Sequence, residues 1–305
     1  VALGDPAAAR VYSYDYTETG RTQRWLGRAA AHRLERAPEG WRPDSAQALG
    51  MQMSLAPQTP GRWGLRQGFD IDLRGLQAQP LAGLTRLVRL VENRPEEVLR
   101  VLRIGAVTHV VALHRVAGGL LRPVAEVPSL FPEPVRVEAV PDPLPRAYAV
   151  GGVRVADGIH GLMALVDPAF DPRREIVLPE GRSAPAPLGF LGAARVVRET
   201  ADRVQLEVEL SADGHVVLVE GHDPGWKARV DGRPVPLLRA NVAFRAVRVP
   251  AGRHVVAMVY RPAAALVGLL VSGVALVALA AALARSTRPS RAGSRACSTP
   301  GKERS

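Results

Sequence analysis

The sequence predicts a protein of the α+β class, with a mixed α/β domain, an all-β region of sandwich type and one long apolar helix near the C-terminal end. Three observations carry this prediction. Helix and strand patterns alternate over residues 1–150, close-spaced strand patterns fill residues 193–261, and residues 263–284 form an apolar run without a charge. The chain has 305 residues, 47% of them hydrophobic, which allows two domains with sizeable cores and excludes a wholly disordered chain.

The α/β domain begins with a strand pattern at Arg10–Tyr16, where aromatic and polar residues alternate. Apolar residues at helical spacing predict a short helix over Leu81–Val91. Pro95, followed by two glutamates, predicts the start of another helix, because proline suits the first helical position and acids suit the positive end of the helix dipole. This helix is expected to end near Gly105, and a buried strand is expected at Ala106–Leu113.

Two further segments of this half differ in composition from their surroundings. Residues 36–64 are rich in Pro, Gly and Gln and are expected to be irregular. Residues 151–192 are predicted as an α/β extension, in which Asp157 caps a short helix and Glu175–Leu178 forms a strand. The extension ends in a linker, residues 179–192, that is rich in Pro, Gly and Ala.

The all-β region, residues 193–261, is predicted as a β-sandwich of jelly-roll-like type because short strand patterns follow one another closely. The seven expected strands are 193–199, 203–210, 215–220, 226–230, 234–238, 243–249 and 254–260. Asp213-Gly214 and Asp231-Gly232 predict hairpin turns, since a type I′ turn requires positive φ at both central residues.

The apolar run at 263–284 contains 22 residues with one hydroxyl, that of Ser272. As a helix it would be roughly 33 Å long at about 1.5 Å per residue, enough to cross a bilayer core of about 30 Å. A buried helix of a soluble domain is the alternative, but such a helix would be apolar on every face and would lead into a charged tail. The segment is therefore predicted as a transmembrane helix.

The positive charge of the chain is concentrated behind this helix. The formal net charge is +11, and the tail 285–305 holds six basic residues and one acidic residue, a net +5. Short basic segments stay on the cytoplasmic side of a membrane, so the tail is predicted to be cytoplasmic and disordered, and residues 1–260 extracytoplasmic. Aromatic residues make up only 5% of the chain and no basic helix is evident, so a nucleic-acid partner is not expected.

This orientation requires that residues 1–260 be exported. The N-terminal residues show no basic stretch followed by an apolar stretch, so they do not resemble a signal peptide. We therefore expect the chain to be the C-terminal part of a longer polytopic membrane protein. A complete protein anchored by its C-terminal helix is the alternative.

Motifs of catalysis and of metal binding are not found in the sequence. There is no glycine-rich phosphate loop, no G-x-S-x-G turn and no H-E-x-x-H pair, and the single Cys297 excludes an internal disulfide and a cysteine-based zinc site. His109 and His114 are five residues apart on an expected strand, hence on opposite faces, and are not expected to share a metal. No catalytic residue, metal ligand or cofactor is predicted for this portion.

Two pairs of residues are candidates for contact with a glycan or with the membrane interface: Asp70 with Asp72, and Trp226 with Lys227. A spacing of two would place both aspartates on one face of a strand, as a general acid/base pair requires, although turn and capping roles are the alternative. Pro224-Gly225 fits a type II turn that would project Trp226 and Lys227. An exposed tryptophan beside a cation can stack on a sugar or lie at the lipid interface, and the alternative is that Trp226 fills the sandwich core.

One continuous segment resembles a known family. Residues 215–261, followed by the apolar helix, are similar to the C-terminal end of the bacterial YfhO-like membrane protein family. The matching groups are Pro224-Gly225-Trp226-Lys227, Val230-Asp231-Gly232, Arg239-Ala240-Asn241, Phe244-Arg245 and Pro250-Ala251-Gly252 with His254. Looser similarity extends to GFDIDLRGL and LRVLRIGAVTHVVAL nearer the N-terminus, with a departure from the family's pattern at Phe69-Asp70-Ile71.

The resemblance implies a polytopic glycosyltransferase of the GT-C type, which transfers a sugar from a polyprenyl-phosphate donor to a cell-envelope polymer outside the cytoplasm. The acidic catalytic residues of that class lie in an early loop without a matching position here, so this portion is expected to be non-catalytic, and whether the chain is an enzyme is left open. The implied partners are the lipid bilayer, the polyprenyl-phosphate sugar and an envelope glycan. The alternative is a membrane-anchored β-sandwich that binds or scaffolds an envelope glycan or a protein partner.

Overall fold

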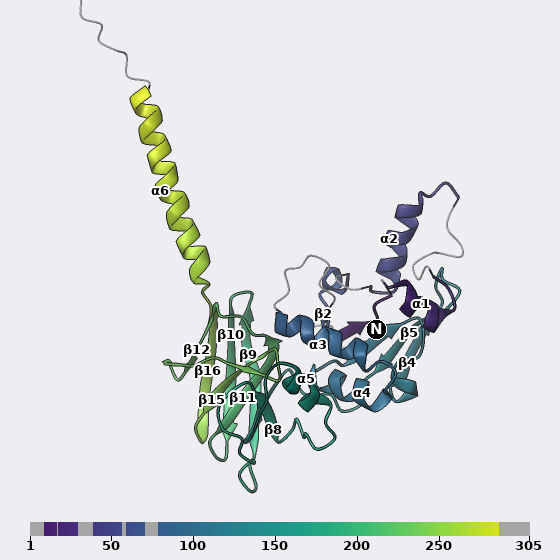
Figure 1. Ribbon diagram of the computed structural model, residues 1–305, viewed down its shortest axis with the longest axis horizontal. Coiled ribbons are helices and arrows are strands. Elements are labelled where there is room, and N and C mark those ends of the chain that lie inside the picture. The colour runs from purple at the N-terminus through teal and green to yellow at the C-terminus, as the bar shows by residue number, and fades with distance from the viewer. Residues whose placement is uncertain (1–8, 17, 30–38, 57–58, 71–78, 287–305) are drawn as a thin grey trace, which may run out of the picture. The chain divides into compact units, whose positions relative to one another are not determined.

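The computed structural model describes residues 9–16, 18–29, 39–56, 59–70 and 79–286 (Figure 1). The chain divides into two compact units, Val1–Arg261 and Pro262–Ser305. Helices and several sheets are present, which confirms the predicted α+β class.

The first sheet has the strand order β2-β1-β3-β5-β4. It contains β1 (Arg10–Ser13), β2 (Arg66–Gln67), β3 (His109–Ala112), β4 (Arg122–Val127) and β5 (Val135–Ala139). β1 is parallel to β2 and to β3, whereas β5 is antiparallel to β3 and β4. The carboxyl ends of β1 and β3 therefore meet at one edge of the sheet.

The helices of the first unit are α1 (Thr19–Leu26), α2 (Pro43–Met53), α3 (Gln79–Leu90), α4 (Pro95–Ile104) and α5 (Gly158–Val166), with 3-10 turns η1 (Pro60–Trp63) and η2 (Ala117–Gly119). α3 and α4 confirm the two predicted helices, and α4 starts at Pro95 and ends before Gly105 as expected. The expectation that residues 36–64 are irregular is wrong, because α2 and η1 form there. Leu49 and Met53 of α2 are partly buried and pack against the first hydrophobic core, and local composition does not reveal this long-range contact.

The predicted α/β extension contains a two-stranded parallel pair, β7 (Gly152–Val155) and β8 (Glu175–Leu178), joined through α5. α5 begins directly after Asp157, as predicted, but without a capping hydrogen bond from the Asp157 side chain. The Asp157 carboxylate instead accepts a hydrogen bond from Arg239 Nη2 at 2.9 Å. A long-range ion pair thus replaces the local interaction that the sequence suggested.

The β-rich part consists of two further sheets. The second sheet has the order β13-β12-β16-β10-β9, and the third has the order β14-β15-β11-β6. The strands are β6 (Ala147–Val150), β9 (Gly192–Thr200), β10 (Arg203–Leu210), β11 (Gly214–Gly221), β12 (Trp226–Val230), β13 (Arg233–Val235), β14 (Leu238–Ala240), β15 (Phe244–Val249) and β16 (Gly252–Tyr260). All seven predicted strands are present, and β14 and the sequence-distant β6 are additional members.

The second and third sheets share one hydrophobic core, to which the second contributes Leu206 and Met258 and the third Leu218 and Val247. The two sheets therefore pack against each other. The first hydrophobic core, against which α2 packs, runs from the first sheet and its helices to Val217 of the third sheet, within the same compact unit. The jelly-roll-like arrangement stays a prediction.

The two predicted hairpin turns have different outcomes. Asp231 and Gly232 have φ values of 48° and 79°, as the type I′ prediction for Asp231-Gly232 requires. Neither Asp213 nor Gly214 has positive φ, so the type I′ prediction for this pair is wrong. Glycine is needed at position 214 for space, since an added Cβ would lie 2.8 Å from the Val150 carbonyl oxygen.

The second unit contains α6 (Ala263–Ser286). Within it Ala263–Leu283 is 21 residues long, has a mean hydropathy of 2.6 and is not buried in protein. By length and composition this helix is able to cross a membrane, which agrees with the predicted span at 263–284. The tail from residue 287, with Cys297, lies outside the described residues, and the side of the membrane on which it lies stays a prediction.

Candidate functional site

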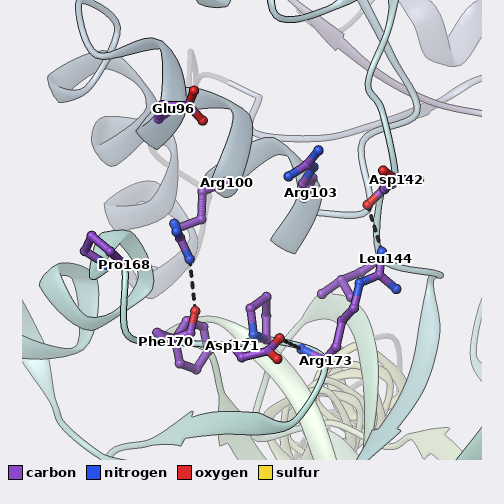
Figure 2. Close-up of a pocket in the computed structure, with 10 residues that line it drawn as sticks. Glu96, Arg100, Arg103, Asp142, Leu144, Pro168, Phe170, Asp171 and Arg173 are labelled. Carbon is purple, nitrogen blue, oxygen red and sulfur yellow. Dashed lines mark hydrogen bonds between the residues drawn. The ribbon is translucent and has the colours of Figure 1, made fainter.

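A cleft of about 800 Å³ in the first unit is bordered by α4 and by the loops that follow β5 and α5 (Figure 2). The helix contributes Glu96, Arg100 and Arg103. These side chains share one face of α4, because residues four and three apart are neighbours on a helix surface. The opposite face, which includes Val98 and Leu102, is buried in the core and fixes the orientation of the helix.

Each arginine of the cleft is held by a backbone carbonyl. Arg100 Nη1 donates to the Phe170 oxygen at 2.9 Å, and Arg103 Nε donates to the Pro141 oxygen at 2.8 Å. Arg173 Nη2 donates to the Asp142 backbone oxygen at 3.0 Å, and Figure 2 shows this bond and that of Arg100 as dashed lines. The guanidinium groups are thus oriented while most of their N–H donors remain available.

Carboxylates also line the cleft, namely those of Glu96, Asp142 and Asp171. Among the described residues no ion pair within 4.0 Å joins Arg100, Arg103 or Arg173 to a carboxylate. Asp171 Oδ1 accepts the backbone N–H of Arg173 at 2.9 Å. Donors and acceptors therefore face one cleft without neutralising each other. A hydroxyl both donates and accepts, so a polyhydroxylated ligand matches this arrangement better than a ligand of one charge.

Asp70 lies just after β2 and is partly buried. Burial raises the pKa of its carboxyl group to about 7, and the nearby positive charge of Arg10 opposes the shift. The Asp70 backbone oxygen accepts a hydrogen bond from Thr85 Oγ1 at 3.0 Å. Asp72 lies outside the described residues, so the predicted pairing of the two aspartates stays a prediction.

A network of arginines and glutamates joins β1 and β2 to the β-rich part. Arg66 of β2 and Arg146 both bind the Glu199 carboxylate of β9, at 2.8 and 2.6 Å. Arg146 also reaches Glu220 of β11 at 2.9 Å, and Arg10 of β1 lies 3.7 Å from the same carboxylate. These contacts fix the first sheet against the other two.

Trp226 is the first residue of β12 and is half-buried. The Arg245 guanidinium carbon lies 3.8 Å from the indole centroid, and the Tyr260 ring centroid lies 5.3 Å away. Trp226 also packs against the core of the two sheets, so part of the ring has the core position given as the alternative. The remaining edge lines a shallow cavity of about 570 Å³ beside exposed Lys227, whose Nζ donates to the Pro224 oxygen at 3.2 Å.

Asp70 follows β2 of the first sheet, whereas Trp226 and Lys227 lie on β12 of the second sheet, so the structure does not bring these candidates into one site. A glycan or interface role for Trp226, Lys227, Asp70 and Asp72 stays a prediction.

A smaller cavity, of about 190 Å³, lies at the carboxyl ends of β1 and β3, where the strand order reverses around β1. Ligands of α/β folds often bind at such an edge. His114 forms part of its lining, stacks on Trp25 at 4.6 Å between ring centroids, and faces the Tyr16 hydroxyl at 2.7 Å from Nδ1. Burial lowers the pKa of His114 to about 4, so the ring is neutral at physiological pH.

Metal binding has no candidate cluster in the described part of the chain, where no group of three or more His, Cys, Asp or Glu side chains is placed to hold an ion. His109 and His114 have separate partners, Thr108 Oγ1 at 3.0 Å and the Tyr16 hydroxyl at 2.7 Å. The expectation that this portion carries no cofactor stays a prediction.

The residues of the large cleft are not among the sequence candidates. The spacing of Glu96, Arg100 and Arg103 is a signal in the sequence, because it places three charged residues on the polar face of a helix. The contributions of Asp142 and Arg173 depend on loops far along the chain, which no local pattern brings together.

Comparison with known proteins supports the resemblance over one segment. The model of the family described as Bacterial membrane protein YfhO matches residues 194–272. The match begins in β9 and ends inside α6, so it covers nearly all of the second sheet and the first part of the apolar helix. No curated protein and no solved structure matches the chain significantly. The chain is thus similar to a family of membrane proteins, and its apolar helix fits a membrane location.

Proposed function

We propose that the chain is the extracytoplasmic C-terminal region of a polytopic bacterial membrane protein that transfers a sugar from a polyprenyl-phosphate donor to a cell-envelope polymer. The observation that carries the proposal is the continuous family match from β9 into α6. The transfer chemistry belongs to another part of such a protein, and this region serves as a non-catalytic module at the membrane.

A second candidate function is that of a module that binds an envelope glycan. The cleft of Figure 2 favours it, because its arginines and carboxylates are oriented toward one space and are not paired with each other. The two functions are compatible, since a glycan bound in the cleft would be held near the membrane where a polymer is modified.

The sidedness is tested by labelling with a membrane-impermeant maleimide. Cys297, the one cysteine of this chain, lies in the predicted cytoplasmic tail and is expected to react only after the cells are opened. In a Cys297→Ser background, Asp213→Cys adds a thiol at an exposed turn, and this thiol is expected to react in intact cells, or in spheroplasts where an outer layer blocks the reagent. Labelling of Cys297 but not of position 213 in unopened cells would contradict the proposed orientation.

The roles in transfer and in binding are separated by kinetics of the whole membrane protein. Arg100→Gln with Arg103→Gln is expected to raise KM for the acceptor glycan while kcat changes little, because the cleft binds without taking part in bond formation. Arg86→Gln, an exposed arginine of α3 outside the cleft, is the matched control. A fall in kcat without a change in KM would contradict the non-catalytic role, and unchanged kinetics would contradict the glycan cleft.

A further inference from the structure

Four basic residues of the second sheet lie at one end of its outward face. Arg203 of β10 and Lys227 of β12 both lie opposite Val259 of β16. Arg198 of β9 and Arg229 of β12 occupy the next outward row, on either side of the pairing between Gln205 and Ala257. We call Arg198, Arg203, Lys227 and Arg229 the basic rows.

Burial shows that these side chains point away from the core. Val204, Ala228 and Met258, the neighbours of Arg203, Lys227 and Val259, are at most 4% exposed. Successive residues of a strand face opposite sides, so the basic rows lie on the solvent side of the sheet. All four basic residues are exposed.

The basic rows have little acidic compensation. Arg203 lies 3.6 Å from Asp202 in an exposed pair. Within the described ranges Arg198, Lys227 and Arg229 make no ion pair with a carboxylate, and Lys227 and Arg229 donate to backbone oxygens of Pro224 and Gly232.

The far end of the same face is neutralised. Arg195 pairs with Glu207 at 2.6 Å, and Arg253 pairs with Glu209 at 3.1 Å. On this outward face the basic residues without a glutamate partner therefore lie toward the end at which β16 finishes.

That end of the sheet is joined to the apolar helix by a very short segment. β16 ends at Tyr260 and α6 begins at Ala263, so only Arg261 and Pro262 intervene. The three Cα–Cα steps from Tyr260 to Ala263 span about 10 Å when extended, while the headgroup layer on each side of a bilayer core is roughly 5 to 8 Å thick. Trp226 and Tyr260 pair in the last row of the sheet, and such aromatic residues are enriched at the membrane interface.

We propose that the basic rows bind the headgroups of anionic phospholipids in the leaflet that α6 enters. This inference rests on the proposed attachment of the chain to a membrane. The complementarity is electrostatic: each basic residue near an anionic surface adds a factor of roughly five to lipid binding. The paired arginines at the far end add nothing comparable, because their charge is already neutralised.

The test uses the full chain in nanodiscs that contain equal amounts of phosphatidylglycerol and phosphatidylcholine. After transfer to detergent, the lipids retained by the protein are counted by native mass spectrometry. The protein is expected to retain phosphatidylglycerol in preference. Arg203→Gln with Lys227→Gln is expected to lower this preference at least fivefold, whereas Arg195→Gln with Arg253→Gln, which removes the same charge from the same face, is expected to change it less than twofold.

Three results would overturn the inference. The first is an equal effect of the two double variants, and the second is displacement of phosphatidylglycerol by soluble polyphosphate. The third is that truncation after Ser286 abolishes the lipid preference while Arg203→Gln with Lys227→Gln leaves it unchanged. The last result would assign lipid selectivity to the basic tail. Resistance to alkaline extraction from membranes reports separately on the proposed function. If the unaltered chain is extracted, membrane attachment fails; if it resists extraction but shows no lipid preference, only the basic rows are refuted.

Discussion

Glu199 is the acceptor that joins the first sheet to the β-rich part, and Glu199→Gln is expected to destabilise the first unit at neutral pH. Arg146 donates to both Glu199 oxygens at 2.7 and 2.6 Å, and Arg66 donates at 3.2 and 2.8 Å. The hydrogen bonds from Arg146, aided by Arg66 and opposed by burial, lower the pKa of Glu199 to about 2 from an ordinary value of 4.5. The ionised form is thus favoured in the folded state.

The magnitude follows from this pKa. A fall from 4.5 to about 2 corresponds to roughly 3 kcal/mol at about 1.36 kcal/mol per pKa unit. The Glu199 side chain is 30% exposed, and screening by solvent reduces the expected loss to about 1.5 to 2 kcal/mol. The lowered pKa means that this stabilisation is present above the unfolded-state pKa of about 4.5 and disappears as the pH falls toward 2.

Residues 1–261 contain both hydrophobic cores, and their unfolding in urea at several pH values gives the free energy of unfolding of the unaltered protein and of the variant. The loss of free energy in the variant is expected to be complete near pH 7 and to shrink between about pH 4.5 and pH 2. Glu207→Gln on the neighbouring strand is the control, because its partner Arg195 is 76% exposed and the pair contributes under about 0.5 kcal/mol. Equal losses for both variants at pH 7, or a Glu199 effect independent of pH, would refute the reasoning.

Three further predictions concern other parts of the chain. Asn241 is fully buried, has a φ of 46° and donates to the Tyr148 hydroxyl at 2.8 Å, so Asn241→Ala is expected to lower the free energy of unfolding by about 2 to 4 kcal/mol in urea titrations. Hydrogen bonding to Asp231 raises the pKa of His254. This contact therefore stabilises the fold below about pH 6.5, and the stabilisation is lost as the pH rises through the folded-state pKa. The effect of Asp231→Asn on the melting temperature is expected to be larger at pH 5.5 than at pH 8.5. Val274→Arg places a charge near the middle of α6 at a cost of about 2.5 to 3.5 kcal/mol, and is expected to make the chain extractable from membranes at alkaline pH while the near-UV spectrum of the first unit is retained.

The elements that the sequence predicts correctly are those whose signals are local. Pro95 with its two glutamates predicts the start of α4, and Asp231-Gly232 predicts a turn whose φ values the structure confirms. Local patterns fail where a distant contact decides the outcome. In α2 the partly buried Leu49 and Met53 pack against the first core, and Asp157 binds Arg239, a residue far along the chain, instead of capping its own helix.

Candidate sites suffer from the same limit, because sites consist of residues that are distant in sequence. Trp226 stands out as an aromatic residue after a turn, but only the folded chain shows Arg245 covering one face of its ring. The cleft of α4 combines a helical charge pattern, present in the sequence, with loop residues such as Arg173 that no local pattern brings to it.

Charge is the property for which the folded arrangement changes the interpretation most. By sequence, the tail after the apolar helix accounts for about half of the net charge, +5 of +11, and no local pattern shows where the charged side chains of residues 193–261 lie in the fold. The strand register separates them: Arg195 and Arg253 face glutamates, while Arg198 and Arg203 of one hairpin come to the same two rows as Lys227 and Arg229 of another. A shift of β12 by one residue against β16 would turn Lys227 toward the core and Ala228 toward solvent. The burial of Ala228 and Val230 therefore also keeps Lys227 and Arg229 on the outer face of the sheet. The packing of the core and the position of the basic rows are therefore consequences of one pattern.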